Sequence, residues 1–199
     1  MFKSILTTIA LIVTATTASA GVSYDPVTRS LEVSGYTTMR QVQAANLEMR
    51  SNEVLTVILS GPGGDYYAGM ALGRAIRNEG ANVIIPENST CVSACAFASL
   101  GGERVIVDGE LWFHAPYLTM APTNVTILDI THKFGIAYLD MPVYLSEQGV
   151  SIRLANDIIR RTSTCKFIVV DSGEEITKLR SGEFPHTHTG YQHKILNNC

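Results

Sequence analysis

The sequence predicts one α/β domain whose sheet is mostly parallel. Residues 54–59 (VLTVIL) form a continuous apolar and partly β-branched run, which is typical of a strand covered on both faces. Strand-like and helix-like segments alternate along the chain, and this favours parallel strands joined by helices. The 199 residues are 46% hydrophobic and 17% charged, as expected for a folded chain with its own core. Since no internal linker or fixed repeat is visible, residues 21–199 are expected to form a single domain.

The first twenty residues predict a secretory signal peptide. Lys3 is their only charge, residues 5–13 are apolar, and residues 18–20 (Ala-Ser-Ala) place small side chains before a cleavage site. The mature chain is therefore expected to begin near Gly21 and to be periplasmic or secreted. The alternative is an uncleaved anchor helix, but a stretch of about 16 moderately apolar residues is short for a bilayer. No later segment is long and apolar enough to span a membrane.

The elements before residue 80 follow from turn and cap signals. Residues 22–33 alternate loosely and predict a β-hairpin. Thr37 or Thr38 is suited to cap a helix that runs to about Arg50. After the strand at 54–59 we expect a tight Gly-Pro-Gly-Gly turn at 61–64 and a helix at 66–78.

The elements after residue 80 continue the alternation. Gly135 and Pro142 are expected to break or bend the long helix among them. In chain order we expect a strand at 82–86, a buried helix at 93–100 that stops at two glycines, strands at 104–107 and 111–114, and helices at 127–148, 151–161 and 174–180.

Three segments carry the residues suited to chemistry: 59–76, 91–102 and 110–116. Each follows a strand or ends one, and in an α/β sheet such ends converge on a common crevice. Ser93 begins a helix among small residues, so it is either a plain helix N-cap or a hydroxyl beside the open N–H of Ala94. The two interpretations are compatible.

Glycine and histidine complete this set of candidates. Gly63 and Gly64 mark either a simple turn or a stretch whose N–H groups are open to a substrate carbonyl. His114 lies in an apolar strand, where histidine is usually a satisfied core residue. It acts as a base only if its ring reaches the Ser93 hydroxyl, at roughly 2.6–3.2 Å.

The cysteine count predicts disulfides. An exported chain with four cysteines is expected to form two bridges, with three connectivities open. Cys91 and Cys95 are close enough in sequence to pair, which would leave Cys165 with Cys199. Cross-pairing and free buried thiols are the alternatives. A bridge between Cys91 and Cys95 would make the turn around Ser93 rigid.

The ordered set of motifs resembles the proteolytic subunit of the Clp protease, in the ClpP/crotonase superfamily. That family has Ser-Pro-Gly-Gly followed by Ala-Gly-Met, similar to residues 61–64 (Gly-Pro-Gly-Gly) and 68–70 (Ala-Gly-Met). Its nucleophile sits in a small-residue segment, similar to residues 92–94 (Val-Ser-Ala). Its histidine lies in a His-Gln-Pro context, similar to residues 114–116 (His-Ala-Pro). The resemblance covers about residues 54–183 and leaves a tail at 184–199.

The resemblance implies a superhelix of repeated β-β-α units and a serine-protease-like site. Ser93 would be the nucleophile and His114 the general base. The N–H groups of Ala94 and of Gly64 or Gly63 would form the oxyanion hole. The implied reaction is hydrolysis of a peptide or another acyl group through an acyl-enzyme, with no cofactor, in a homo-oligomer.

One departure from the family concerns the triad acid. The family's aspartate lies shortly before a strand led by phenylalanine, which resembles Phe167, but residues 161–164 (RTST) hold no carboxylate. Asp157, about one helical turn earlier, is the nearest candidate, and Thr162 or Ser163 is a neutral substitute. The other aspartates considered are Asp129, Asp140 and Asp171.

Three functions are compared. The first is an exported serine hydrolase, specifically a peptidase acting on short or unfolded peptides. The second is a catalytically degenerate ClpP-like binding or assembly protein, favoured by the missing acid. The third, an acyl-CoA enzyme of crotonase type, is disfavoured by export and by the lack of an acid/base glutamate in the motif segments.

Two ligand classes are not expected. The net charge of −3 and the lack of a basic block argue against nucleic acid. A group of histidines in the tail is more typical of a solvated terminus than of a metal site. These histidines are His186, His188 and His193.

Overall fold

The computed structural model describes residues 21–117, 127–150, 152–163, 165–170, 174–175 and 191–195. The expected signal peptide and most of the tail lie outside these ranges. The strands are β1 (Val22–Asp25), β2 (Ser30–Thr37), β3 (Thr56–Gly64), β4 (Asn82–Ile85), β5 (Thr90–Val92), β6 (Val105–Val107), β7 (Glu110–Phe113), β8 (Lys166–Val170), β9 (Glu174–Glu175) and β10 (Tyr191–Ile195). The helices are α1 (Met39–Ser51), α2 (Tyr66–Glu79), α3 (Ala94–Ser99), α4 (Ile127–Glu147) and α5 (Ile152–Arg161).

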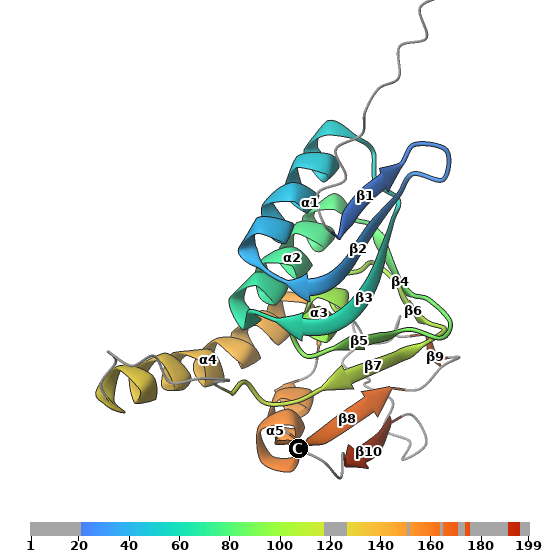
Figure 1. Ribbon diagram of the computed structural model, residues 1–199. Helices are drawn as coiled ribbons and strands as arrows, with labels where there is room; N and C mark the ends of the chain where they lie inside the picture. Colours follow the sequence, from blue (N-terminus) through green and yellow to red (C-terminus); the bar gives the residue numbers. More distant parts are fainter. Residues whose placement is uncertain are drawn as a thin grey trace, which may run out of the picture.

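The long strand β3 joins two halves of one sheet (Figure 1). Its first part pairs in parallel with β2 and β4, and β4 pairs in parallel with β6. Its later part pairs in parallel with β5, and β5 with β7. Antiparallel strands occupy the margins, where β1 pairs with β2, β9 with β6, and β8 with both β7 and β10.

The order of elements repeats a β-β-α unit. β4, β5 and α3 form one unit, and β6, β7 and α4 form the next. Within each unit the first strand joins one half of the sheet and the second strand joins the other. The predicted α/β architecture, a succession of β-β-α units with a mostly parallel sheet, is confirmed by this topology.

Helices α1 and α2 begin and end where side-chain chemistry favours it. The Thr38 hydroxyl accepts a hydrogen bond from the Gln41 N–H at 3.2 Å, which confirms the predicted cap of α1. Asp65 caps α2 by accepting from the Ala68 N–H at 2.9 Å. At its other end, α2 stops at Gly80, which adopts the left-handed conformation. No helix within the described ranges is both long enough and apolar enough to cross a membrane.

The expected tight turn at 61–64 is wrong. These residues continue β3 and stay paired with β2, with Tyr36 opposite Gly63 and Thr37 opposite Gly64. A register shift between Ser34 and Tyr36 keeps the two strands aligned. The local Gly-Pro-Gly-Gly pattern is typical of turns, but pairing with a distant strand overrides it.

Two helix predictions also differ from the structure. Residues 174–175 form strand β9 against β6, so the helix expected at 174–180 is wrong there, and residues 176–180 lie outside the described ranges. The helix expected at 127–148, with Gly135 and Pro142 breaking or bending it, is not broken and runs through both residues as α4. Burial of Met141, Tyr144 and Leu145 gives tertiary packing that outweighs the local cost of proline.

Candidate active site

The parallel ladder brings the predicted nucleophile and base to neighbouring strand ends. Ser93 directly follows β5 and His114 directly follows β7. These strands pair with Val92 opposite Trp112, and the Ser93 N–H donates to the Trp112 carbonyl at 2.8 Å. The sheet therefore places the two residues at the same edge, as the sequence predicts.

Ser93 has a strained backbone and an uncommitted hydroxyl. Its φ of 57° and ψ of −121° are rarely adopted by L-residues. Its side chain makes no cap hydrogen bond to α3, so the hydroxyl does not act as a plain N-cap. A positive φ at a sharp strand-to-helix turn is the geometry that exposes a nucleophilic serine in other hydrolases.

A disulfide closes over this turn. Cys91 and Cys95 are bonded, with their Cα atoms 5.2 Å apart, and both are buried. The predicted pairing is thus confirmed, and Ser93 is the middle residue of the five-residue ring. Cys165 is disulfide-bonded too, whereas its expected partner Cys199 lies outside the described residues.

Gly63 packs directly against the serine turn. A Cβ placed on it would lie 2.5 Å from the Val92 carbonyl oxygen, 2.7 Å from Ser93 Cβ and 2.9 Å from the Ala94 nitrogen. Ala94 is the first residue of α3, so its N–H has no partner within the helix. Gly64 lies instead against Thr37 of β2. The predicted oxyanion segment therefore contacts the predicted nucleophile.

His114 is held in one orientation by its own backbone and by aromatic rings. It is 5% exposed, and its Nδ1 lies 2.8 Å from the Ala115 carbonyl oxygen. Because a carbonyl only accepts, this contact assigns the proton to Nδ1 and leaves a lone pair on Nε2. The rings of Tyr117 and Phe167 lie 5.0 and 5.2 Å from the imidazole.

Burial sets the protonation of this imidazole. Loss of solvation lowers the pKa of His114 below its usual value of 6.5, and the hydrogen bond to Ala115 opposes that shift in part. The ring is therefore neutral at pH 7, which is the form required of a base.

No carboxylate among the described side chains takes the position of a triad acid. Asp157 pairs with Arg161 one turn along α5, at 3.1 Å, and has no hydrogen bond to His114. Burial and, to a smaller extent, the charge of Asp140 raise the pKa of Tyr66 and Tyr67, so Asp140 lies near the start of α2. The side chain of Asp129 and all of Asp171 lie outside what the structure describes.

Thr162, a neutral substitute considered from the sequence, has no hydrogen bond to the imidazole ring. Its hydroxyl accepts from the Ala115 N–H at 2.8 Å and donates to the Ile158 carbonyl at 2.5 Å. It therefore fixes the main chain directly after His114 and ties it to α5. No hydrogen bond joins the Ser93 hydroxyl to His114 in this structure.

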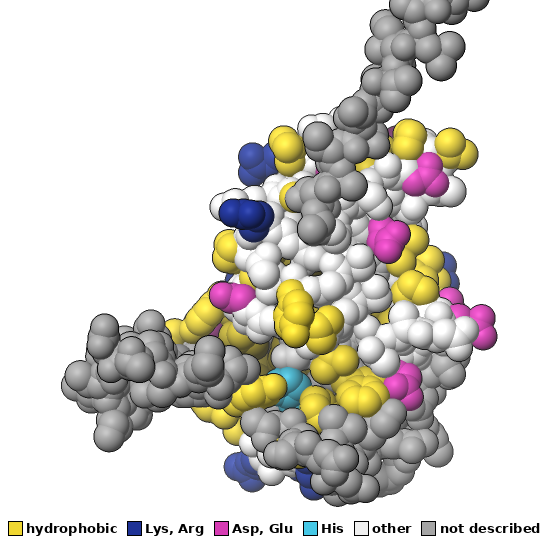
Figure 2. Space-filling model, viewed as in Figure 1, with side chains coloured by type: hydrophobic (Ala, Val, Ile, Leu, Met, Phe, Trp, Pro, Cys, Tyr) yellow, Lys and Arg dark blue, Asp and Glu magenta, His cyan; other side chains and the backbone are white. Residues whose placement is uncertain are grey.

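The surface around the site is largely apolar. In Figure 2, the exposed part of a histidine side chain is bordered on several sides by hydrophobic side chains. Tyr36, Tyr67 and Tyr117 are among the exposed large side chains of the described residues. Such a surface fits a peptide with apolar side chains better than a strongly charged ligand.

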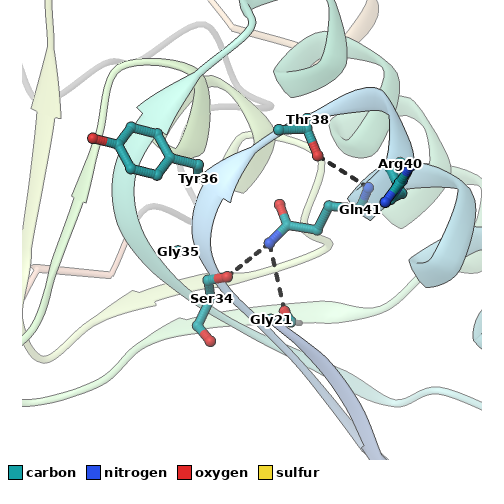
Figure 3. A pocket seen from close by; sticks show the side chains of 7 residues that line it. All are labelled: Gly21, Ser34, Gly35, Tyr36, Thr38, Arg40 and Gln41. Atoms are coloured by element: carbon teal, nitrogen blue, oxygen red, sulfur yellow. Dashed lines mark hydrogen bonds between the residues drawn. The ribbon is translucent and has the colours of Figure 1, made fainter. Parts of the chain in front are cut away.

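A pocket that the sequence did not predict opens beside β2 (Figure 3). Its volume is about 540 Å³, and Gln41, one of the residues that line it, donates from Nε2 to the carbonyl of Ser34 at 2.7 Å and to that of Gly21 at 3.5 Å. Tyr36 at its rim pairs with Gly63, which links the pocket to the edge of the site. The other lining residues are Gly35, Thr38 and Arg40.

Comparison with known proteins gives a distant likeness. No protein-family model matches the chain, and no curated protein matches it. Among solved structures, the chain is similar to the 1510-N membrane-bound stomatin-specific protease in a mutant form. The identity is 18% and the TM-score is 0.47, over 65% of this chain and 67% of that chain. A likeness of this size says nothing about activity.

Proposed function

We propose that this protein is a serine hydrolase of the ClpP/crotonase type that cleaves peptides through an acyl-enzyme. The observation that carries the proposal is the state of Ser93. Its backbone is strained, its hydroxyl is uncommitted, and its strand end lies beside that of a neutral, oriented His114. Strain of this kind is kept where function requires it.

The proposed reaction uses only groups of this chain. Nε2 of His114 removes the proton as the Ser93 oxygen attacks the substrate carbonyl, and the carbonyl oxygen becomes an oxyanion. The N–H of Ala94 and a glycine N–H from residues 63–64 stabilise that oxyanion. The imidazolium then gives its proton to the leaving amine, and water hydrolyses the acyl-enzyme by the same steps.

The Ala115 carbonyl takes part of the role that a triad carboxylate plays, since no described carboxylate is hydrogen-bonded to His114. It fixes the tautomer by accepting from Nδ1, as a triad carboxylate does. Being neutral, it stabilises the imidazolium less than a carboxylate would. We therefore expect turnover below that of a complete triad, on chemically activated or readily accessible substrates.

A fluorophosphonate probe tests the nucleophile directly. Wild type should be labelled at Ser93, and both Ser93→Ala and His114→Ala should abolish labelling. Ser99→Ala is the matched control, because this serine lies in the same short helix with its hydroxyl bonded to the Ala96 carbonyl. A wild type that never labels would refute the proposal.

That outcome would favour the second candidate, a degenerate binding protein. The observation in its favour is that no carboxylate is hydrogen-bonded to His114 among the described residues. If the protein is a binding protein, Ser93→Ala should leave partner binding unchanged.

Export and assembly form part of the proposal. Bonded Cys91 and Cys95 fit an oxidising compartment, as does the apolar leader. N-terminal sequencing of the exported protein should begin at or near Gly21. Light scattering should give a multiple of the monomer mass, and a monomer mass would exclude the homo-oligomer.

A further inference from the structure

Two tyrosines of α4 reach the segments that carry the proposed catalytic pair. The Tyr144 hydroxyl donates to the Phe97 carbonyl of α3 at 2.6 Å. The Tyr138 hydroxyl donates to the Pro116 carbonyl, two residues after His114, at 3.4 Å. One helix therefore contacts both the nucleophile helix and the base segment, although its first part projects from the body of the molecule (Figure 1).

Phe97 is the residue through which Tyr144 reaches the site. Its N–H donates to the Ser93 carbonyl at 3.0 Å, so it closes the turn that holds the nucleophile. Its ring meets Phe113 edge-on, with centroids 5.8 Å apart, and Phe113 directly precedes His114. A shift of Phe97 would thus move Ser93 relative to His114.

Tyr144 is built into the fold as a fixed donor. Its side chain is fully buried, and Gly73 of α2 leaves the space in which the hydroxyl lies. Arg74 lies over the ring at 5.3 Å and pairs with Glu147 of α4 at 2.6 Å, so α2 also holds α4 at this point. Burial raises the pKa of Tyr144, and the phenol stays protonated as the hydrogen bond requires.

We infer that α4 is a positioning element for the proposed catalytic pair, and that Tyr144, acting through Phe97, is its main positioning residue. The expected effect on catalysis rests on the proposed function. The positioning of the Ser93 turn by Tyr144 does not depend on that function. Tyr138 acts in the same way on the base segment. Its effect is smaller, because a hydroxyl bond of 3.4 Å is weaker than one of 2.6 Å.

Removal of single hydroxyls tests the inference. Tyr144→Phe removes only the hydroxyl donor, and the Phe97 carbonyl still accepts a hydrogen bond from the Leu100 N–H at 3.2 Å. The variant is therefore expected to fold. Tyr24→Phe is the matched control, because the Tyr24 hydroxyl also donates to a backbone carbonyl, that of Glu53 at 3.2 Å, from strand β1. Both variants lose one bond of the same chemical type.

Two measurements are made on each variant. The first is amide hydrogen exchange, which does not depend on catalysis. In Tyr144→Phe the amides of α3, Phe97 above all, should exchange about tenfold faster relative to those of β4, which serve as the internal reference. The second is the rate of fluorophosphonate labelling at Ser93. It should fall about tenfold in Tyr144→Phe and less in Tyr138→Phe, since a misplacement of about 1 Å costs up to a hundredfold. Tyr24→Phe should leave both readouts at the wild-type value.

The outcomes separate this inference from the proposed function. If wild type does not label but α3 exchange rises in Tyr144→Phe, the hydrolase proposal fails and the positioning of the Ser93 turn by α4 stands. If exchange is unchanged relative to β4, the inference is overturned. If exchange rises while labelling keeps its wild-type rate, Tyr144 is only a stabilising residue and the inference is overturned as well.

Discussion

Gly63→Ala gives a sharp test of the contact between the predicted oxyanion segment and the nucleophile. The added Cβ would lie 2.7 Å from Ser93 Cβ and 2.5 Å from the Val92 carbonyl oxygen. Ordinary contact begins near 3.4 Å, so the serine turn or β3 has to move by about 0.9 Å to clear the Val92 carbonyl oxygen. A displacement of about 1 Å at a reacting group costs up to a hundredfold in rate. We therefore expect fluorophosphonate labelling of Ser93 to fall by roughly tenfold to a hundredfold.

Gly35→Ala is the control for backbone strain. Gly35 and Gly63 share a φ of +87°, so alanine meets the same conformational cost of about 1–2 kcal/mol at either position. At Gly35, however, an added Cβ meets nothing within 4 Å. Gly35→Ala should therefore lower the melting temperature and leave the labelling rate unchanged.

The comparison isolates the steric contact. Labelling rates are measured at a temperature where both variants are fully folded, which near-ultraviolet circular dichroism verifies. Equal labelling rates in the two variants would refute the claim that residue 63 contacts the working nucleophile.

Four further outcomes are expected from the same turn and its base. Ser93→Gly should have a free energy of unfolding about 1 kcal/mol higher than Ser93→Ala in calorimetry, because glycine relieves the strain of the positive φ. Equal stabilities would contradict the strain. Labelling should lose rate on acidification with a midpoint below pH 6.5, because burial lowers the pKa of His114 and only the neutral ring accepts a proton. A midpoint above 6.5 would contradict the burial argument. The same shift makes folding stability fall as the pH drops through about 6.5, where the unfolded chain binds the proton first. Replacing Cys91 and Cys95 together by alanine should cost about 2 kcal/mol in denaturant unfolding, from closure of the short ring. Unreduced wild type showing four free thiols on titration would contradict the bridge.

Much of the fold was predictable because local signals agree with it. The cap at Thr38, the apolar run that begins β3 and the helical spacing in α2 each reflect interactions between near neighbours in sequence. The errors occur where a distant partner decides the structure. The pattern of residues 61–64 predicts a turn, but pairing with β2 makes them part of a strand. The pattern that includes residues 174–175 predicts a helix, but these residues pair with the edge of β6.

The site was predicted in part for the same reason. The sequence predicts Ser93 and His114 as the reacting pair and allows a Cys91–Cys95 bridge, and the structure places the two residues at neighbouring strand ends and bonds the two cysteines. It does not show that Thr162 holds the main chain instead of the imidazole, or that a carbonyl of the adjacent residue orients the ring. These are hydrogen bonds to the backbone, and any residue type supplies that partner.

The position of β3 has a consequence for folding. Because this strand takes part in both halves of the sheet, neither half closes its ladder without it. The described domain should therefore unfold cooperatively as one unit, and fragments that end before residue 56 or begin after residue 64 should not fold.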